Sequence, residues 1–396
     1  MKKQILFVID SLDVAGSEKS LISLLSLLDF NEYSVDLQLF QHGHMLEKLV
    51  PKEVNVLKPI KYTTFTNLKL NKAILYSVRN FKYKMLSSRL KFSIKVRGKQ
   101  FTNRQKSRIY WQNSCDVIDR PLQKYDIAIS YSQGIPTFYV ADKVDAVKKF
   151  TWVNVSYKLD DMEKSFQKPF YDKYNKIVAV SDSTKEILLK TFPEYSTDIE
   201  VIYDINNPKS ISNMAEIGKS YQDNFSGIRL LTIGRLDHQK GYDIALEACE
   251  NLKKQGINFR WYVLGKGPLK QEIENEIRKN ELSEHFILLG VEANPYPFIK
   301  NSDIYVQTSK FEGFGLAIAE ARMLNIPVVT TEFDAVYNQM KQKKNGLVVD
   351  MNGESVCNGI LELINNMQLK QEIITYLQQE KKGNVEELDR FYKLVN

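Results

Sequence analysis

Short apolar runs rich in Val, Ile and Leu alternate with stretches of helical length along most of the chain. These runs cover residues 4–10, 33–40, 125–132, 148–155 and 176–181, followed by 228–234, 259–265, 286–290, 303–309, 326–331 and 346–350. Most runs lack a strict polar–apolar alternation, which is typical of strands buried on both faces of a parallel sheet. Because segments of helical length such as 241–255 separate them, the pattern predicts an α/β protein built from βαβ units.

The alternation stops at residues 206–224, which are polar and show no clear period. A chain of 396 residues is long enough for two or three domains. We predict two Rossmann-like domains with parallel sheets that face an interdomain cleft. The predicted parts are an N-terminal domain at 1–208, a linker at 209–224, a second domain at 225–372 and a C-terminal helix at 373–396 that packs back across the interface.

Composition and cysteine usage exclude several classes of protein. With 43% hydrophobic and 26% charged residues, the chain is globular rather than disordered. Cys115, Cys249 and Cys357 lie far apart, which excludes a disulfide framework or zinc finger and indicates a reducing compartment. The apolar run at 5–9 is too short for a signal peptide, and no window approaches the roughly 18 apolar residues of a membrane span. We therefore expect a cytoplasmic protein, either dissolved or peripheral on the inner face of the cell membrane.

The charge of the chain is distributed unevenly. Its net charge is +7, but residues 61–110 hold nine Lys and five Arg and no Asp or Glu. Within this basic insertion, apolar residues recur at steps of three or four, with cations between them. The apolar positions are Ile74, Val78, Phe81, Met85, Leu86 and Leu90.

An apolar stripe flanked by Lys and Arg is typical of a helix that lies in a membrane interface. We therefore predict an anionic membrane surface as a partner. The side chains predicted to contact it are Lys72, Arg79, Phe81, Lys82, Lys84, Arg89 and Lys91. A helix packed on the domain with solvated cations is one alternative. Binding of nucleic acid is another, although no nucleic-acid-binding motif accompanies the aromatic residues.

A turn of small residues at 11–18 joins the first predicted strand to a helix. Such a turn lets backbone N–H groups and the helix dipole meet a phosphate, and Gly16 lies where that approach would occur. The turn is neither a G-x-G-x-x-G fingerprint nor a Walker loop. A plain strand-to-helix turn is therefore the alternative.

Two cations lie around the end of a later strand and the start of the next helix. Arg235 follows that strand, and Lys240 directly precedes the helix that opens at Gly241. Arg provides a planar fork and Lys a point charge beside a helix N-terminus, which together favour a diphosphate. Two solvated surface cations are the alternative.

Glu312 and Glu320 flank a glycine-rich turn and lie just over two helical turns apart. We expect Glu312 in the loop at the carboxyl end of a strand and Glu320 on the helix behind it. Open α/β sheets bind ligands at this edge, and glycines let backbone amides approach closely. Two acids near a helix N-terminus are the simpler alternative.

The C-terminal half resembles the retaining family 4 glycosyltransferases of the GT-B fold. The resemblance covers 228–350 and rests on GRLDHQKG (234–241), VLGKGP (263–268), Asn294-Pro295, SDIYVQTSKFEGFGLAIAEA (302–321) and NIPVVTT (325–331). The spacing of Glu312 and Glu320 is the family's signature. The resemblance is weak over 61–124.

This resemblance implies a nucleotide-sugar site in which Arg235, Lys240 and Glu312 are catalytic. The two cations would neutralise the leaving diphosphate, Glu312 would position the donor sugar, and Glu320 would accept hydrogen bonds from the ribose. The other donor-binding residues it implies are Gly16, Asn154, Gly265, Gly267, Pro268, Gly290, Val291, Phe314, Gly315 and Leu316. Asn154 stands where many members carry a His, and a loop-capping Asn is the alternative.

The implied reaction moves a hexose or N-acetylhexosamine, with retention, from a UDP-linked donor to a lipid-linked or polymeric glycan acceptor. We expect no metal and no cofactor, because the sequence contains no Asp-x-Asp, and His42 and His44 are expected in a surface loop. The product would enter a capsule, exopolysaccharide or wall polymer. The alternatives are a soluble or protein acceptor, and a non-catalytic GT-B scaffold that binds membrane or polyanion.

Overall fold

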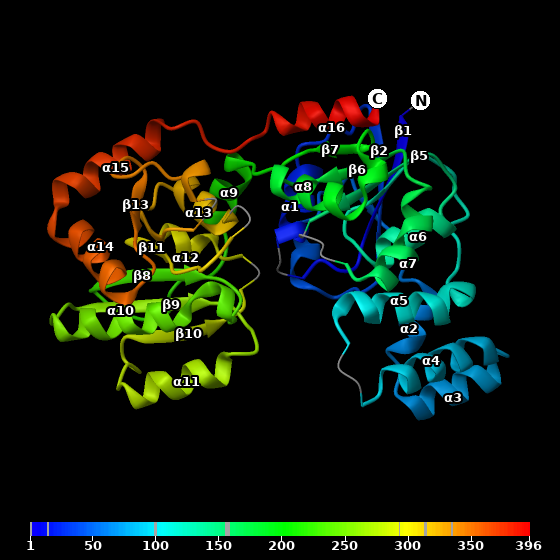
Figure 1. Cartoon of the computed structure of the whole chain (residues 1–396), viewed down its shortest axis with the longest axis horizontal. Coiled ribbons are helices and arrows are strands. Elements are labelled where there is room, and N and C mark those ends of the chain that lie inside the picture. The colour runs from blue at the N-terminus through cyan, green and yellow to red at the C-terminus, as the bar shows by residue number, and fades with distance from the viewer. Residues whose placement is uncertain are drawn as a thin grey trace. The chain divides into compact units, whose positions relative to one another are not determined.

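A computed structural model describes residues 2–13, 16–98, 101–154, 159–292, 294–312, 315–333 and 336–396 (Figure 1). The chain forms two units, and it enters and leaves the second one once. The first unit comprises Met1–Ile205 and Val385–Asn396, and the second comprises Asn206–Asn384.

The first unit contains a seven-stranded parallel sheet in the order β3-β2-β1-β4-β5-β6-β7. The strands are β1 (Lys3–Ile9), β2 (Tyr33–Leu39), β3 (Asn55–Val56), β4 (Tyr125–Ser130), β5 (Ala146–Val153), β6 (Lys176–Ala179) and β7 (Ile199–Val201). The sheet is buried on both faces, as β1 illustrates. Leu6 and Val8 belong to one apolar core, whereas Ile5, Phe7 and Ile9 belong to the core on the other side.

Helices cover both faces of this first sheet. They are α1 (Gly16–Leu25), α2 (Lys61–Thr66), α3 (Leu70–Arg79), α4 (Tyr83–Val96), α5 (Asn103–Ser114), α6 (Ile135–Lys143), α7 (Asp161–Tyr171), α8 (Asp182–Thr191) and α16 (Glu387–Val395). Short 3₁₀ turns lie at Met45–Leu49 (η1), Cys115–Val117 (η2) and Pro193–Tyr195 (η3). Figure 1 shows α3 outermost, with α4 between it and α5.

The second unit contains a six-stranded parallel sheet in the order β10-β9-β8-β11-β12-β13. Its strands are β8 (Ile228–Ile233), β9 (Phe259–Leu264), β10 (Phe286–Gly290), β11 (Ile304–Gln307), β12 (Val328–Thr331) and β13 (Gly346–Val349). Its helices are α9 (Pro208–Ala215), α10 (Tyr242–Lys254), α11 (Lys270–Lys279), α12 (Tyr296–Lys300), α13 (Leu316–Met323), α14 (Gly353–Asn365) and α15 (Met367–Gln379). The 3₁₀ turns are His238–Lys240 (η4) and Val336–Asn338 (η5).

The predicted fold class is confirmed, because each unit is a parallel sheet covered by helices on both faces. Every run predicted as a strand contains one. The structure adds β3 and β7, which occupy the two edges of the first sheet and span only two and three residues. The interdomain cleft stays a prediction.

The structure differs from the expected linker at 209–224. Residues Pro208–Ala215 form α9, whose Asn207 side chain caps the helix and whose Ile211 and Ala215 are buried in the core of the second unit. A helix with a buried face belongs to the unit it packs on, so the boundary falls at Ile205. The C-terminal segment 373–396 is likewise two elements, because α15 ends at Gln379 in the second unit and α16 packs in the first.

None of the helices in the described part of the chain is long and apolar enough to cross a bilayer.

Candidate functional site

The strand order of the second unit reverses between β8 and β11, which are neighbours in the sheet. Connections from these two strands leave in opposite directions, so the edge at their carboxyl ends is open, and ligands bind open α/β sheets at such a point. The predicted cations follow β8, and Glu312 follows β11. The fold therefore brings these two parts of the sequence together.

Glu312 and Lys240 form an ion pair at this edge, with side chains only 10% and 17% exposed. The same carboxylate oxygen of Glu312 accepts hydrogen bonds from Gln307 Nε2 and from Ser309 Oγ, each at 2.7 Å. Gln239 Nε2 lies 3.4 Å from the other oxygen. Charge-assisted bonds of this kind hold both side chains in one geometry. The ammonium group of Lys240 is thus held in place beside the strand ends, with its charge balanced by Glu312.

Two glycines allow the loops at this edge to pack against one another. Gly241 has φ +62°, and a Cβ there would lie 2.1 Å from the carbonyl oxygen of Thr308. A Cβ at Gly265 would lie 1.9 Å from the carbonyl oxygen of Gly234. Neither position tolerates a side chain without backbone movement. The predicted Gly265 and Gly267 therefore lie directly against the loop that carries Arg235.

Glu320 lies on α13 and is 2% exposed. The hydroxyl of Tyr296 donates to its Oε1 at 3.0 Å. Burial, and then the neighbouring Glu320 carboxylate, raise the pKa of Tyr296 well above its usual range. This tyrosine therefore stays a hydrogen-bond donor at any ordinary pH. As predicted, Glu312 lies in the loop after the strand and Glu320 on the following helix.

Arg235 is arranged differently from Lys240. Its side chain is 69% exposed, and its Nε lies 3.1 Å from Asp237 Oδ2. The two cations therefore differ in exposure: Lys240 is partly buried against Glu312, whereas Arg235 is largely exposed and pairs with Asp237.

The remaining predicted positions of the second unit lie around the same strand ends. Gly290 ends β10, and its carbonyl accepts a 2.7 Å bond from the amide of Gly265. Val291 is half-buried in the loop after β10, and Pro268 is exposed in the loop after β9. Gly315 has φ +80° and caps α13, and Leu316 is the first residue of that helix. Phe314 lies outside the described residues.

Gly16 and Asn154 belong to the first unit, which is described separately from the second. Gly16 is exposed and begins α1. Asn154 follows β5, and its Nδ2 donates to the carbonyl of Tyr131 at 2.7 Å. Among the groups that the structure describes, its buried Oδ1 has no hydrogen-bond partner. The amide therefore ties the ends of β4 and β5 together, in agreement with the loop-capping alternative, and one acceptor is left over.

The basic insertion differs from the single helix that was expected. The chain breaks between α3 and α4, where Phe81 has φ +54°. Met85 is buried, and Arg89 donates to the carbonyls of Leu68 at 2.7 Å and Phe65 at 3.4 Å. The Arg89 guanidinium therefore holds neighbouring backbone, and its contact with a membrane stays a prediction. The other predicted membrane residues are exposed: Lys72, Arg79, Phe81, Lys82, Lys84 and Lys91.

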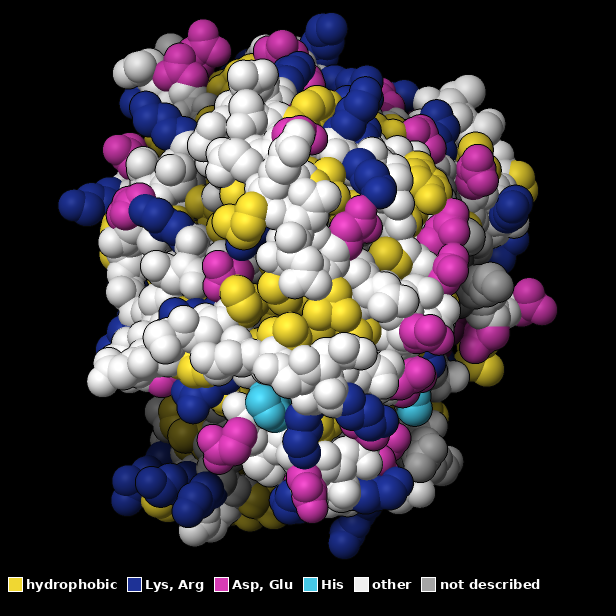
Figure 2. Space-filling model, turned by 90° about the vertical axis from the view of Figure 1, so that its left-hand side faces the viewer, with side chains coloured by type: hydrophobic (Ala, Val, Ile, Leu, Met, Phe, Trp, Pro, Cys, Tyr) yellow, Lys and Arg dark blue, Asp and Glu magenta, His cyan; other side chains and the backbone are white. Residues whose placement is uncertain are grey.

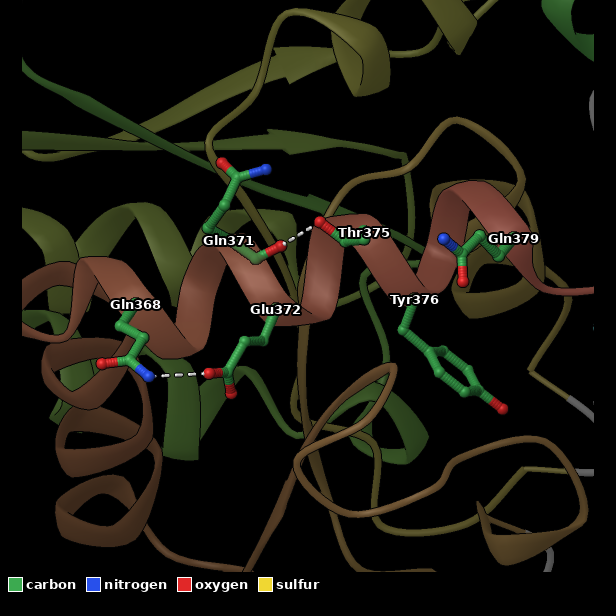
Figure 3. A pocket seen from close by; sticks show the side chains of 6 residues that line it. All are labelled: Gln368, Gln371, Glu372, Thr375, Tyr376 and Gln379. Carbon is green, nitrogen blue, oxygen red and sulfur yellow. Dashed lines mark hydrogen bonds between the residues drawn. The ribbon is translucent and has the colours of Figure 1, made fainter.

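A hollow on α15 lies apart from these strand ends (Figure 3). All the residues that line it come from this one helix, and several bond to one another, as Gln368 does to Glu372 at 2.9 Å. We assign it no function. In the described ranges no three His, Cys, Asp or Glu side chains converge as metal ligands would.

Sequence reasoning did not assign roles to Gln307, Ser309, Gln239, Tyr296 or Asp237. Gln307 and Ser309 are 1% exposed, at the end of an otherwise apolar strand. A polar residue in that position was the available signal, because buried polar groups need partners.

Two doubly wound units joined in one chain also occur in known structures. Known structures share this architecture over the whole chain. TarM of Staphylococcus aureus, crystallised with fondaparinux, alpha-GlcNAc-glycerol and UDP, superposes with a TM-score of 0.65 at 16% identity, covering 100% of both chains. HepE of Anabaena, in complex with UDP and glucose, superposes with a TM-score of 0.66 at 15% identity, covering 99% of each chain. At these identities the likeness shows the fold alone, which is GT-B.

The sequence of the second unit matches a family model over most of its length. Residues 216–380 match the model of the family described as Glycosyl transferases group 1. The resemblance to GT-B glycosyltransferases is thereby confirmed, and assignment to family 4 stays a prediction.

Curated relatives match about half of the chain. One is the N-acetylgalactosamine-N,N'-diacetylbacillosaminyl-diphospho-undecaprenol 4-alpha-N-acetylgalactosaminyltransferase of Campylobacter jejuni, 26% identical over 202 residues, which are 50% of this chain and 53% of that protein. Another is the poly(ribitol-phosphate) alpha-N-acetylglucosaminyltransferase of Staphylococcus aureus, 26% identical over 200 residues, which are 49% of this chain and 38% of that protein. The chain therefore spans about two fifths to one half of the length of the relatives it matches.

Proposed function

We propose that this chain is a retaining glycosyltransferase that moves a hexose or N-acetylhexosamine from a UDP-sugar to a lipid-linked or polymeric glycan acceptor. The observation that carries the proposal is the partly buried Lys240–Glu312 pair at the strand-order reversal of the second unit. Three further side chains donate hydrogen bonds to Glu312 and hold it in place. Because Glu312 in turn holds the ammonium group of Lys240, this cation is positioned before an anionic ligand binds.

The roles follow from position and chemistry. Lys240, held by Glu312, and Arg235, which is largely exposed, would neutralise the diphosphate of the donor. Glu320, with its donor Tyr296, would accept hydrogen bonds from the ribose. The N-terminus of α13 adds first-turn amides that lack intrahelical partners, and these favour negative charge.

Donor and acceptor class are proposed from the relatives. TarM and HepE were crystallised with UDP, which supports a uridine nucleotide. The printed names of the two curated relatives specify a diphospho-undecaprenol and a poly(ribitol-phosphate) acceptor, which supports a lipid-linked or polymeric glycan. We place the reaction at the cytoplasmic face of the membrane, where such acceptors are presented, in the synthesis of capsule, exopolysaccharide or wall polymer.

In the proposed reaction the bond between the anomeric carbon and the phosphate oxygen breaks, and the acceptor hydroxyl oxygen bonds to that carbon on the same face. The departing phosphate takes the proton of the acceptor hydroxyl, so charge and atoms balance. The protein's contribution is to stabilise the charge that develops on the diphosphate and to exclude water. No metal is part of this proposal.

The first test measures donor binding. UDP and UDP-sugars should raise the thermal midpoint of the wild-type protein, since a ligand at a hundredfold over its Kd adds about 2.7 kcal/mol. Glu320→Gln should lose most of that shift because the amide cannot replace both acceptor oxygens. Glu272→Gln, on the exposed face of α11, is the matched control and should behave as wild type.

The second test measures transfer. Lys240→Ala should lower kcat by about 10²–10³-fold, the usual cost of one lost electrostatic contact to a transition state. The control Lys279→Ala removes an exposed lysine of α11 and should leave kcat unchanged. NMR of the product should show the anomeric configuration of the donor.

Absence of a shift with every nucleotide, together with no transfer, would overturn the proposal in favour of a non-catalytic scaffold. Transfer to soluble or protein hydroxyls alone would retain the enzyme and replace the acceptor.

A further inference from the structure

The outer helix of the basic insertion is attached to the first unit by small side chains. Ala73 and Ser77 are the buried residues of α3. By contrast, α4 is attached more firmly, because Ser88 donates to the carbonyl of Asn113 and shares a 2.8 Å hydrogen bond with Tyr62. Helix α3 therefore covers little of the core, although it is amphipathic.

The larger aliphatic side chains of α3 are each about half exposed to solvent. We call Leu70, Ile74, Leu75, Val78 and Phe81 the α3 face. Leu70, Ile74 and Val78 follow at i, i+4 and i+8 and so form one stripe. Val78 is 53% exposed, and Phe81, at the corner before α4, is 80% exposed. Single exposed apolar residues are ordinary, but a contiguous exposed group marks an interaction site.

The cations around this face have no acidic partners. Nine of them form no ion pair with any described residue: Lys69, Lys72, Arg79, Lys82, Lys84, Lys91, Lys95, Arg97 and Lys106. Elsewhere, lysines on surface helices pair with nearby acids, as Lys254 does with Glu250 and Lys279 with Glu276. Figure 2 views the molecule from the left-hand side of Figure 1, where the helices of the second unit lie, and side chains of both signs are interspersed on that face. The positive charge at α3 and α4 is therefore uncompensated.

We propose that the α3 face and these cations dock on an anionic lipid bilayer, with Phe81 at the deepest point. Aliphatic side chains such as Ile74, Leu75 and Val78 enter an acyl layer, whereas they offer no ring for a nucleic-acid base to stack on. Lys and Arg beside an apolar stripe are attracted by anionic headgroups. The aliphatic stripe and the cations together match a lipid surface, whereas RNA would use the charge and the exposed rings of Phe81 and Tyr83 but would leave the aliphatic stripe uncovered.

The docking itself does not depend on the proposed function. Only its role does, because docking would bring the proposed enzyme to an acceptor held in the membrane. The inference also refines the sequence prediction. The apolar docking residues are on α3 and at the Phe81 corner, the cations extend over α4 and α5, and Met85 and Arg89 of α4 serve the fold.

Co-sedimentation with vesicles tests the inference directly. Wild-type protein should bind vesicles of equimolar phosphatidylglycerol and phosphatidylcholine at least tenfold more tightly than pure phosphatidylcholine. Binding should weaken at high salt, where the Debye length falls from about 10 Å to about 3 Å. The double variant Val78→Ser/Phe81→Ser and the double variant Lys72→Glu/Arg79→Glu should each lose at least tenfold in affinity.

Matched controls separate docking from general effects of polarity or charge. Leu122→Ser/Val147→Ser changes two exposed apolar residues of the same unit, and Lys254→Glu/Lys279→Glu makes the same charge change on the second unit. Both should bind vesicles as wild type does. A thermal shift with UDP that is unchanged in the docking variants shows that they are folded and that the donor site is intact.

Wild-type protein that fails to bind anionic vesicles, or docking variants that bind them as wild type does, would overturn the inference. Salt-sensitive binding of single-stranded RNA without vesicle binding would replace the membrane by nucleic acid. Because vesicle binding needs neither donor nor transfer, its failure is distinct from failure of the proposed function.

Discussion

Asp10 lies where β1 ends, beside the loop that leads to Gly16, and its charge is strongly controlled by the fold. Burial raises the pKa of its carboxyl to about 7, with Glu18 as the second cause. The hydroxyl of Ser132, which follows β4, lies 3.5 Å from its Oδ2 and opposes that rise. Strand order also reverses here, between β1 and β4. The first unit thus carries a carboxyl near neutrality at its own strand-order reversal.

The raised pKa makes stability depend on pH. The folded state holds a proton that the unfolded state has lost between the ordinary value of 3.8 and about 7. The stability from this group is therefore fully present below pH 3.8 and is lost as pH rises through about 7. Asp10→Asn should remove this dependence, which amounts to at most about 1.4 kcal/mol per pH unit.

Hydrogen exchange of β1 and β4 amides at several pH values measures this prediction. The variant should be more stable than wild type above pH 7. That difference should shrink as the solution is acidified. A constant difference at every pH would contradict it.

At the scale of elements, the last helix completes the first unit. Phe391 of α16 is fully buried, with its ring centroid 6.2 Å from that of Phe7 and 6.1 Å from that of Trp152. Tyr392 stacks on Tyr33 with centroids 5.7 Å apart. The final residues of the chain therefore pack on its first strand.

Phe391→Ala should lower the free energy of unfolding of the first unit by about 3–5 kcal/mol, the usual cost of a large buried ring. The second unit should be unaffected, since α16 belongs to the first. Exchange of β1 and β5 amides should accelerate, while exchange of β8 and β11 amides stays as in wild type. Equal acceleration in both sheets would contradict the division into two units.

Elements differ in how far the sequence predicts them. Central strands such as β1 and β8 are long apolar runs, and their existence was predicted correctly. The edge strands β3 and β7 were not predicted, because two or three residues are too few to show a pattern of apolar residues. The break between α3 and α4 was not predicted either. The residue with positive φ there is Phe81 rather than a glycine, and no proline interrupts the helical pattern.

The candidate site was predicted unevenly for a related reason. Lys240 and Glu312 belong to recognisable motifs, so their types and neighbourhoods could be read from the sequence. Their direct pairing could not, because it joins positions 72 residues apart. Partners such as Gln307 and Tyr296 are defined by three-dimensional packing alone.

At the scale of the whole molecule, the two units carry separate cores and separate strand-order reversals. If the proposed donor site is right, UDP at a hundredfold over its Kd should slow exchange in β8 and β11 by an amount equivalent to about 2.7 kcal/mol. Strands β1 and β4 should be protected less. Hydrogen exchange with and without UDP measures this, and protection confined to the first sheet would contradict the assignment of the donor to the second unit.

The second unit starts and ends at the same spot. The amide of Asn206 donates to the side chain of Asn384 at 2.8 Å, and a Cβ on Gly383 would lie 2.5 Å from the carbonyl of Asn206. A segment whose ends touch leaves its host with only a short gap to close. Residues 206–384 therefore form an inserted unit whose two ends lie side by side. If the proposed donor site is right, exchanging residues 206–384 for the matching segment of a relative, at the two junctions 205/206 and 384/385, should change the donor preference while the first unit stays unaltered.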